Sequence, residues 1–110
     1  MILSKIIEKL NLTVHNNVST NKEVVGGYTS DLLSDVMGNA TEGDIWVTMQ
    51  THKNIVAVAS LKELPAIIIS NGNLPDEDTI EAANEEEVVL LSTEETTFEI
   101  TGKIYEMLKS

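Results

Sequence analysis

Residues 42–73 read EGDIWVTMQTHKNIVAVASLKELPAIIISNGN, and this stretch decides the fold. Two short apolar runs, 44–49 and 66–70, have the length and composition of buried strands. Between them lies a compact apolar segment, 54–64, that we interpret as a helix, although its β-branched residues also suit a strand. A strand, a crossover of this length and a second strand predict a parallel βαβ unit.

The remaining sequence extends this unit in both directions. Apolar spacing and capping signals predict further helices at 1–10, 29–37, 75–86 and 92–108, and short apolar runs predict further strands at 12–15, 24–25 and 88–91. Adjacent glycines, Gly26 and Gly27, follow one of these runs just ahead of a helix. The 110 residues suit one core. We therefore expect a single compact α/β domain with a mostly parallel sheet of about five strands and flanking helices.

Helix starts and buried faces can be predicted residue by residue. The N-cap candidates are Thr29 or Ser30, then Asn54, then Ser92 or Thr93, and Ser92 with Glu95 matches a capping box. Leu32, Leu33, Val36 and Met37 form the predicted buried stripe of one helix. On the last helix, Phe98, Thr101, Tyr105 and Leu108 share one side, flanked by Ile100, Ile104 and Met107. We expect Trp46 in the core.

The charge balance excludes several classes of partner. Eighteen acids against seven lysines give a net charge of −11, and there is no arginine. Nucleic-acid affinity depends on Lys and Arg contacts to phosphate, so we expect neither a nucleic-acid partner nor an anionic membrane surface. Ten acids fall between Asp76 and Glu99. This run is either a solvated helix face or a docking face for a basic protein.

The same composition says little about catalysis. The chain has no cysteine and only two histidines, His15 and His52, neither in a nucleophile or metal-binding motif. No glycine-rich phosphate-binding motif occurs. We therefore expect no enzyme activity, no metal and no cofactor. The N-terminal segment alternates apolar residues with Lys and Glu, which indicates an amphipathic helix and not a signal peptide. No apolar run spans a membrane, and we expect a cytoplasmic protein.

The segment 26–108 resembles the DRTGG domain, a small α/β module similar in fold to the N-terminal domain of HPr kinase/phosphorylase. The resemblance lies in the order of motifs: Leu32-Leu33, then Glu42-Gly43-Asp44 and Thr48, then Ile67-Ile68-Ile69-Ser70-Asn71-Gly72. Where the family tends to carry Asp-Arg after the first strand, this chain has His52-Lys53; in place of Thr-Gly-Gly it has Ser70-Asn71-Gly72. The resemblance implies a regulatory or ligand-sensing module, often dimeric, without kinase activity.

Ligands of open α/β sheets bind beyond the carboxyl ends of the strands. The candidate ligand-binding residues are therefore Thr51, His52, Lys53, Asn54, Ser70, Asn71 and Gly72, with Gly26 and Gly27. Lys53 and a helix N-terminus favour a small polar or anionic ligand, nucleotides included. The alternative is a structural or interaction module that acts through dimerisation or its acidic face. We expect a homodimer, because the helix at 54–64 is apolar nearly all round.

Overall fold

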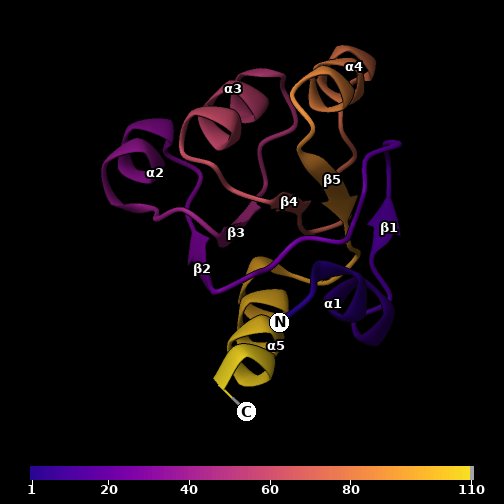
Figure 1. Cartoon of the computed structure of the whole chain (residues 1–110), viewed down its shortest axis with the longest axis vertical. Coiled ribbons are helices and arrows are strands. Elements are labelled where there is room, and N and C mark those ends of the chain that lie inside the picture. Colours follow the sequence, from indigo (N-terminus) through magenta and orange to yellow (C-terminus); the bar gives the residue numbers. More distant parts are fainter. Residues whose placement is uncertain (110) are drawn as a thin grey trace.

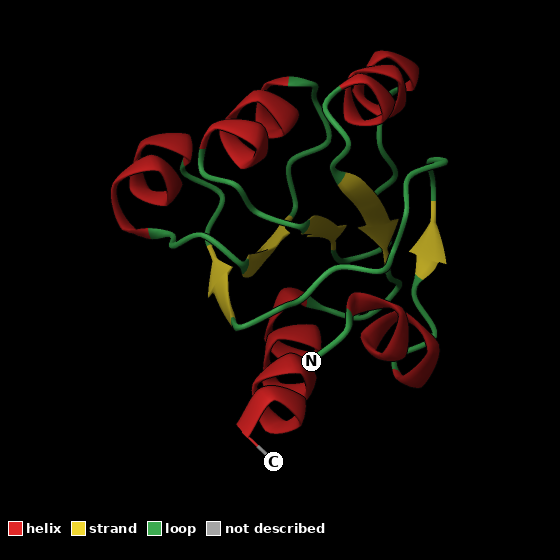
Figure 2. Ribbon diagram, viewed as in Figure 1, coloured by secondary structure: helices red, strands yellow, loops and turns green. Residues whose placement is uncertain are grey.

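The computed structural model describes residues 1–109, in which a five-stranded sheet is covered by helices on both faces (Figures 1 and 2). The helices are α1 (Leu3–Lys9), α2 (Leu33–Asn39), α3 (Asn54–Leu61), α4 (Glu77–Glu85) and α5 (Thr97–Lys109). The strands are β1 (Thr13–Val14), β2 (Gly26–Thr29), β3 (Asp44–Thr48), β4 (Ala66–Ile69) and β5 (Val89–Ser92).

The sheet has the order β1-β5-β4-β3-β2. Strands β2 to β5 are parallel to their neighbours, and only β1 is antiparallel, against β5. The predicted βαβ unit is β3-α3-β4, in which Ile45 pairs with Ala66 and Thr48 with Ile69. The prediction of an α/β fold with a mostly parallel sheet of five strands is therefore confirmed.

Helices α2, α3 and α4 lie on one face of the sheet, and α1 and α5 on the other (Figure 1). Alternate residues of each strand point to opposite faces, so the sheet separates two hydrophobic clusters. Ile45 and Val47 belong to the cluster under α1 and α5, whereas Trp46 belongs to the cluster under α2 to α4. Strands covered on both faces explain the continuous apolar runs in the sequence.

Trp46 is a core residue, as predicted. Its side chain is fully buried, and its indole Nε1–H donates to the carbonyl oxygen of Ser30 at 2.9 Å. A buried indole needs such a partner because the unpaired N–H would lose its hydrogen bond to water. Trp46 thus fixes β3 against the segment that leaves β2.

The structure corrects two expectations about α3. The segment is helical, but it ends at Leu61 and not at residue 64, because Glu63 adopts a positive φ of 58° that breaks the helix. Asn54 is the first helical residue and does not cap it; no side-chain cap is present. The N–H groups of Ile55 and Val56 are instead bonded to carbonyl oxygens of the preceding turn.

The predicted start of α2 is also wrong. The helix begins at Leu33, and neither Thr29 nor Ser30 caps it. The reason is that Asp31 bonds across to the end of β3, which carries the chain past the expected start. Val36 is buried and Leu33 partly so, but Leu32 and Met37 of the expected stripe are exposed.

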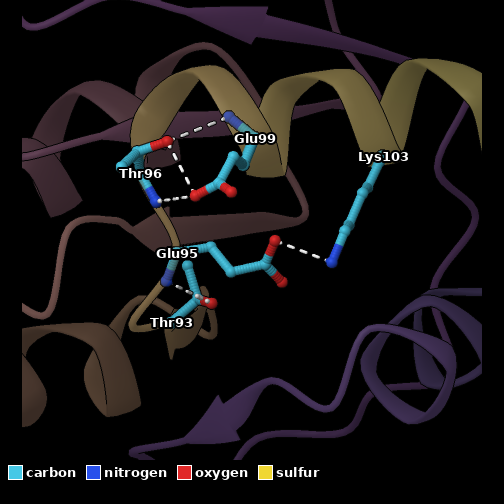
Figure 3. Close-up of polar contacts among 5 residues, drawn as sticks. All are labelled: Thr93, Glu95, Thr96, Glu99 and Lys103. Carbon is cyan, nitrogen blue, oxygen red and sulfur yellow. Dashed lines mark hydrogen bonds and ion pairs between the residues drawn. The ribbon is translucent and has the colours of Figure 1, made fainter.

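The capping box of α5 lies one turn later than predicted (Figure 3). Ser92 is still part of β5, where it pairs with Thr13. The box is formed by Thr96 and Glu99: the Glu99 N–H donates to Thr96 Oγ1 at 3.2 Å, and the Thr96 N–H donates to Glu99 Oε1 at 3.2 Å. Both Ser92 with Glu95 and Thr96 with Glu99 match the capping-box pattern, and the box forms at the second pair because β5 extends to Ser92.

The two adjacent glycines do not form a loop after a strand. Gly26 and Gly27 begin β2, where they pair with Asp44 and Ile45. The expected strand at 24–25 is displaced because the N–H of Val24 donates to the Met1 carbonyl at 2.8 Å, which ties this segment to the N-terminus. A Cβ on Gly26 would lie 2.7 Å from the Asp44 carboxylate, so glycine is needed there for close packing.

Candidate functional site

Loops from four parallel strands meet at one edge of the sheet, which we call the rim. Ser70 follows β4 and donates its N–H to the Thr48 carbonyl at the end of β3, at 2.9 Å. The loops after β2 and β5 flank this pair because their strands are the outer neighbours of β3 and β4. The rim therefore brings together polar segments that are far apart in the sequence, as expected of parallel strands.

The Thr51–Asn54 loop is fastened to the start of α4. The Thr51 carbonyl accepts hydrogen bonds from the Thr79 hydroxyl at 2.7 Å and from the Asp76 N–H at 3.3 Å. His52 Nδ1 lies 2.6 Å from the Asp76 carboxylate. Lys53 and Asn54 are exposed, and within residues 1–109 no carboxylate pairs with the Lys53 ammonium. Lys53 is thus a cation available to an incoming anion.

The Ser70–Gly72 loop faces the segment after β5 instead. Ser70 is fully buried, and its hydroxyl lies 2.6 Å from that of Thr97. The Asn71 N–H donates to the Glu95 carbonyl at 2.7 Å, and the Gly72 N–H donates to the Thr93 carbonyl at 3.0 Å. Both N–H groups are engaged within the protein, so they do not form an open cradle for an anion.

The Glu94 side chain packs close to the backbone of Gly72. The φ of Gly72 is +73°, a conformation that glycine adopts without strain, and a Cβ there would lie 3.2 Å from the Glu94 carboxylate. Glu95 is paired with Lys103 at 2.7 Å (Figure 3). The Ser70–Gly72 side of the rim is therefore acidic, and its only nearby lysine among the described ion pairs is already occupied.

A shallow hollow of about 310 Å³ opens on the other side, between the loops that follow β2 and β3. This rim hollow is lined by Asp31, Met49, Gln50, Thr51 and His52. The Asp31 carboxylate accepts hydrogen bonds from the Thr48 hydroxyl at 2.8 Å and the Met49 N–H at 2.7 Å, and the Gln50 amide donates to the Asp31 carbonyl at 2.7 Å. The hollow is thus built by hydrogen bonds that hold its walls in place.

The sequence prediction and the structure overlap only in part. Thr51 and His52 line the rim hollow, and Lys53 and Asn54 lie next to it in sequence, whereas Asp31, Met49 and Gln50 were not among the predicted residues. Asp31 was missed because it fell within a helix predicted at 29–37, whereas its bonds to Thr48 and Met49 join residues that are far apart in the sequence.

Gly26 and Gly27 are not at the rim. Gly27 pairs with Ile45, three residues before the end of β3 at Thr48, a separation of about 10 Å along the strand. They lie at the opposite end of the sheet from the other candidates. Their grouping with the rim residues was wrong. The strand was expected at 24–25, with the glycines after its carboxyl end, but β2 begins at Gly26, so the glycines lie at its amino end.

Catalytic and metal-binding arrangements are sparse within residues 1–109. His15 Nε2 lies 2.6 Å from Ser92 Oγ, but Ser92 is a buried residue of β5. Burial lowers the pKa of His15. No group of three or more His, Asp or Glu side chains in the described chain is placed to hold a metal ion. None of its helices is long and apolar enough to cross a membrane.

The fold and rim define a class: a three-layered α/β module whose polar strand-end loops surround a shallow hollow. Residues 46–108 match the model of the family described as HPr Serine kinase N terminus, which is more than half of the chain. The chain belongs to this family of DRTGG-like domains, as the sequence motifs indicated. No curated protein sequence matches it.

A solved structure supports the same fold. The chain is similar to the CBS and DRTGG domains of the regulatory region of Clostridium perfringens pyrophosphatase, a structure described as complexed with the activator diadenosine tetraphosphate. The TM-score is 0.69 and the sequence identity 19%. The match covers 91% of this chain but only 44% of the other, so this chain spans less than half the length of that regulatory region.

Proposed function

We propose that this protein is a non-catalytic regulatory module that binds a small polar or anionic ligand at the rim, in the hollow beside Thr51 and His52. The observation that carries the proposal is the hollow itself, since it lies beyond the carboxyl ends of parallel strands, where such sheets bind ligands. Its walls are held in place by internal hydrogen bonds, which supports a site formed before the ligand binds.

A nucleotide is the ligand class that we propose to test first. The similar pyrophosphatase region is described with a dinucleotide activator, and the rim offers matching chemistry. Lys53 is an unpaired cation for a phosphate group, and the hollow presents polar groups of Gln50 and Thr51 to a base or ribose. The carboxylates of Asp31 and Asp76 lie close by and the chain has no arginine, so binding of a highly charged phosphate is expected to be weak.

The two rim loops have different proposed roles. The Thr51–Asn54 loop would contact the ligand directly. The Ser70–Gly72 loop would respond indirectly, since Ser70 is bonded to Thr48 and Gly72 to Thr93. Ligand binding at the hollow would thereby be transmitted to the segment that leads into α5.

The experiment is an NMR titration of the ¹⁵N-labelled protein with diadenosine tetraphosphate, ATP and AMP in separate series. We expect shifts at residues 49–54 and smaller shifts at 70–72. Replacing Lys53 by Gln should weaken binding about tenfold, the effect of losing roughly 1.4 kcal/mol from one charged contact. Lys62→Gln, at the other end of α3, is the matched control and should leave affinity unchanged.

Two results would contradict this proposal. One is the absence of any shift at millimolar concentrations of all three nucleotides. The other is a set of shifts that leaves residues 49–54 untouched. The first result would support the alternative function, an interaction module, whereas the second would show that the ligand binds away from the rim hollow. The observation that favours this alternative is the exposure of Phe98 and Tyr105 on α5. A basic partner would bind instead at the acidic face of α4, which carries Glu77, Asp78, Glu81 and Glu85.

A further inference from the structure

A small cavity lies under α5, where this helix covers β2 and β3 (Figure 1). Its volume is about 90 Å³, and its walls include Ile45 and Val47 of β3 and Ile104 of α5. These three side chains are buried members of the hydrophobic cluster on this face of the sheet. The cavity shares no residue with the rim hollow, so it is a separate feature of the molecule.

The cavity exists because β2 contributes little side-chain volume to this face of the sheet. Alternate residues of a strand point to opposite faces, and Tyr28 belongs to the cluster under α2 to α4. Gly27 and Thr29 therefore face α5, and both line the cavity. Because Gly27 has no side chain, the space between it and Ile104 stays unfilled.

The fold does not require glycine at position 27. The glycines with a positive φ in the described chain are Gly43 and Gly72, and Gly27 is not among them. A Cβ built on Gly27 would lie 3.5 Å from the Ile45 carbonyl oxygen and 3.8 Å from Ile104 Cγ2, which are ordinary van der Waals distances. Glycine inside a strand costs stability relative to alanine, and it often marks a place where a ligand approaches closely. Gly27 thus keeps the cavity open at a cost that packing does not impose.

Two hydroxyl groups give the cavity a polar end. Thr29 of β2 and Thr101 of α5 both line it, and their Oγ1 atoms lie 2.9 Å apart. A hydrogen bond between two hydroxyls uses only one of the two protons, so the pair keeps one donor for a third oxygen atom. None of the described residues that line the cavity is charged, and an ionised group would lose its hydration there without a counter-charge. The cavity therefore suits an uncharged molecule that is apolar apart from one oxygen atom.

We propose that this cavity binds a small uncharged aliphatic molecule with one hydroxyl group, a short-chain alcohol. The aliphatic part packs against Ile45, Val47 and Ile104, and the hydroxyl bonds to the pair formed by Thr29 and Thr101. An apolar cavity of about 150 Å³ accepts benzene. The smaller volume here fits a chain of a few carbon atoms and excludes a nucleotide.

The ligand can reach the cavity without unfolding of α5. Thr29 and Tyr105 are exposed members of its lining, so the cavity meets solvent beside these two residues. The proposed site does not depend on the ligand proposed for the rim, because the two sites share no residue. Either proposal can fail without the other.

The first experiment is an NMR titration of the full chain, labelled with ¹³C and ¹⁵N, with 1-propanol. We expect saturable shifts at the methyl groups of Ile45, Val47 and Ile104 and none at residues 49–54 of the rim. Because so small a ligand binds weakly, the titration extends to about 100 mM. Propionate, which has the same carbon chain and a negative charge, is the matched control and should cause no saturable shift.

Gly27→Ala tests whether the empty space is the binding site. The added methyl group fills part of the cavity and should weaken 1-propanol binding at least about fivefold, since closely packed interiors respond to a change of even one methylene. It should also raise the melting temperature of the free chain, because alanine restricts the unfolded chain and fits the folded one. Gly38→Ala in α2 is the matched control, because its Cβ would meet no atom within 4 Å, and it should leave the affinity for 1-propanol unchanged.

Thr101→Val tests the polar end of the cavity. Valine keeps the shape of threonine but lacks the hydroxyl, so 1-propanol should bind about fivefold more weakly, the effect of losing one hydrogen bond. Xenon enters apolar cavities without a hydrogen bond. Its binding, followed by the same methyl shifts, should be equal in Thr101→Val and the native chain.

Several results would overturn the proposal. The first is the absence of saturable shifts at Ile45, Val47 and Ile104 with 1-propanol. Affinity that neither Gly27→Ala nor Thr101→Val reduces, or equal saturable shifts with propionate, would show that the alcohol binds elsewhere or without the predicted selectivity. A lower melting temperature for Gly27→Ala would show that the fold itself requires glycine and that the cavity is only a packing void.

Discussion

Thr96 determines where α5 begins. Its hydroxyl accepts the Glu99 N–H, and the Glu99 carboxylate accepts the N–H and hydroxyl of Thr96 (Figure 3). We expect Thr96→Ala to lower the free energy of unfolding by about 1 kcal/mol, the usual cost of losing an N-cap. Urea denaturation measures this. Thr93→Ala is the control, since the Thr93 hydroxyl accepts one N–H outside the helix, and its loss should be smaller. An equal or larger loss for Thr93→Ala would contradict the assignment.

The capping box also makes stability depend on pH. The hydrogen bonds from the Thr96 N–H and hydroxyl lower the pKa of Glu99 below its usual value of 4.5. A carboxyl whose pKa is lowered by folding stabilises the native state above its unfolded pKa, and this contribution is lost as the pH falls through the folded value. The difference in unfolding free energy between the native chain and Thr96→Ala should therefore shrink as the pH falls below 4.5.

Single residues show why local motifs were ambiguous. Ser92 with Glu95 and Thr96 with Glu99 match the same capping pattern, and the sequence offers no local reason to prefer the second. The choice depends on where β5 ends, which in turn depends on the pairing of Ser92 with Thr13. Local sequence patterns cannot predict a pairing between residues so far apart. The burial of Trp46 was predicted correctly because it follows from a local feature, the apolar strand that contains this residue.

At the scale of elements, β1 is the weakest part of the sheet. It has two residues, both exposed, and it depends on the contact between His15 and Ser92 at its end. Burial lowers the pKa of His15, so protonation favours the unfolded chain. The contribution of neutral His15 to the free energy of unfolding should be fully present above pH 6.5, the usual pKa of histidine. It should decrease as the pH falls from 6.5 towards the lower pKa that His15 has in the folded chain.

The measurement is thermal unfolding of the native chain and of His15→Gln between pH 5 and 8. The difference in melting temperature between the native chain and His15→Gln should decrease as the pH falls through this range. His52→Gln serves as the control for a general effect of losing an imidazole, because His52 is at the exposed rim. If the melting temperature of the native chain instead rises relative to that of His15→Gln at low pH, the charged form of His15 is the one that stabilises the fold.

The elements also show which parts of the fold the sequence could predict. Strands β3, β4 and β5 are covered on both faces, and their continuous apolar runs predicted them within one residue. Strand β2, at the edge of the sheet, has only Tyr28 as a large side chain, so no such run exists. The sequence placed Phe98 and Tyr105 on one side of the last helix but did not predict that both are exposed, because apolar periodicity does not distinguish a core face from an exposed one.

At the scale of the whole molecule, the sheet separates two surfaces with different charge. The layer of α2, α3 and α4 is acidic, and the layer of α1 and α5 is nearly neutral. The rim lies along the edge between them and carries both signs: Asp31 lines the hollow, Asp76 contacts His52, and Lys53 follows His52 in the chain. The sequence predicted that the loops after β3 and β4 reach this edge, but it wrongly placed Gly26 and Gly27 there. It did not predict that the Ser70–Gly72 loop is closed by its own hydrogen bonds to the segment after β5.

This charge distribution predicts that the protein does not bind nucleic acid, although it is proposed to bind a nucleotide. The proposed nucleotide site relies on a single lysine, Lys53. A nucleic-acid strand requires several cations at regular spacing along its backbone, because affinity comes from the release of counterions at each phosphate that is neutralised. The seven lysines are dispersed, and the net charge of −11 repels the strand at long range.

Fluorescence anisotropy with a labelled 25-nucleotide single strand and the matching duplex tests this prediction. We expect no change at protein concentrations up to about 50 μM in 150 mM salt, and none when the salt is reduced to 50 mM. Lys53→Gln is the control for capture of a phosphate by the rim lysine, and it should give the same flat titration as the native chain. Low-micromolar affinity that weakens as salt is added would contradict the prediction, because it would show that the lysines bind phosphates despite the net charge of −11.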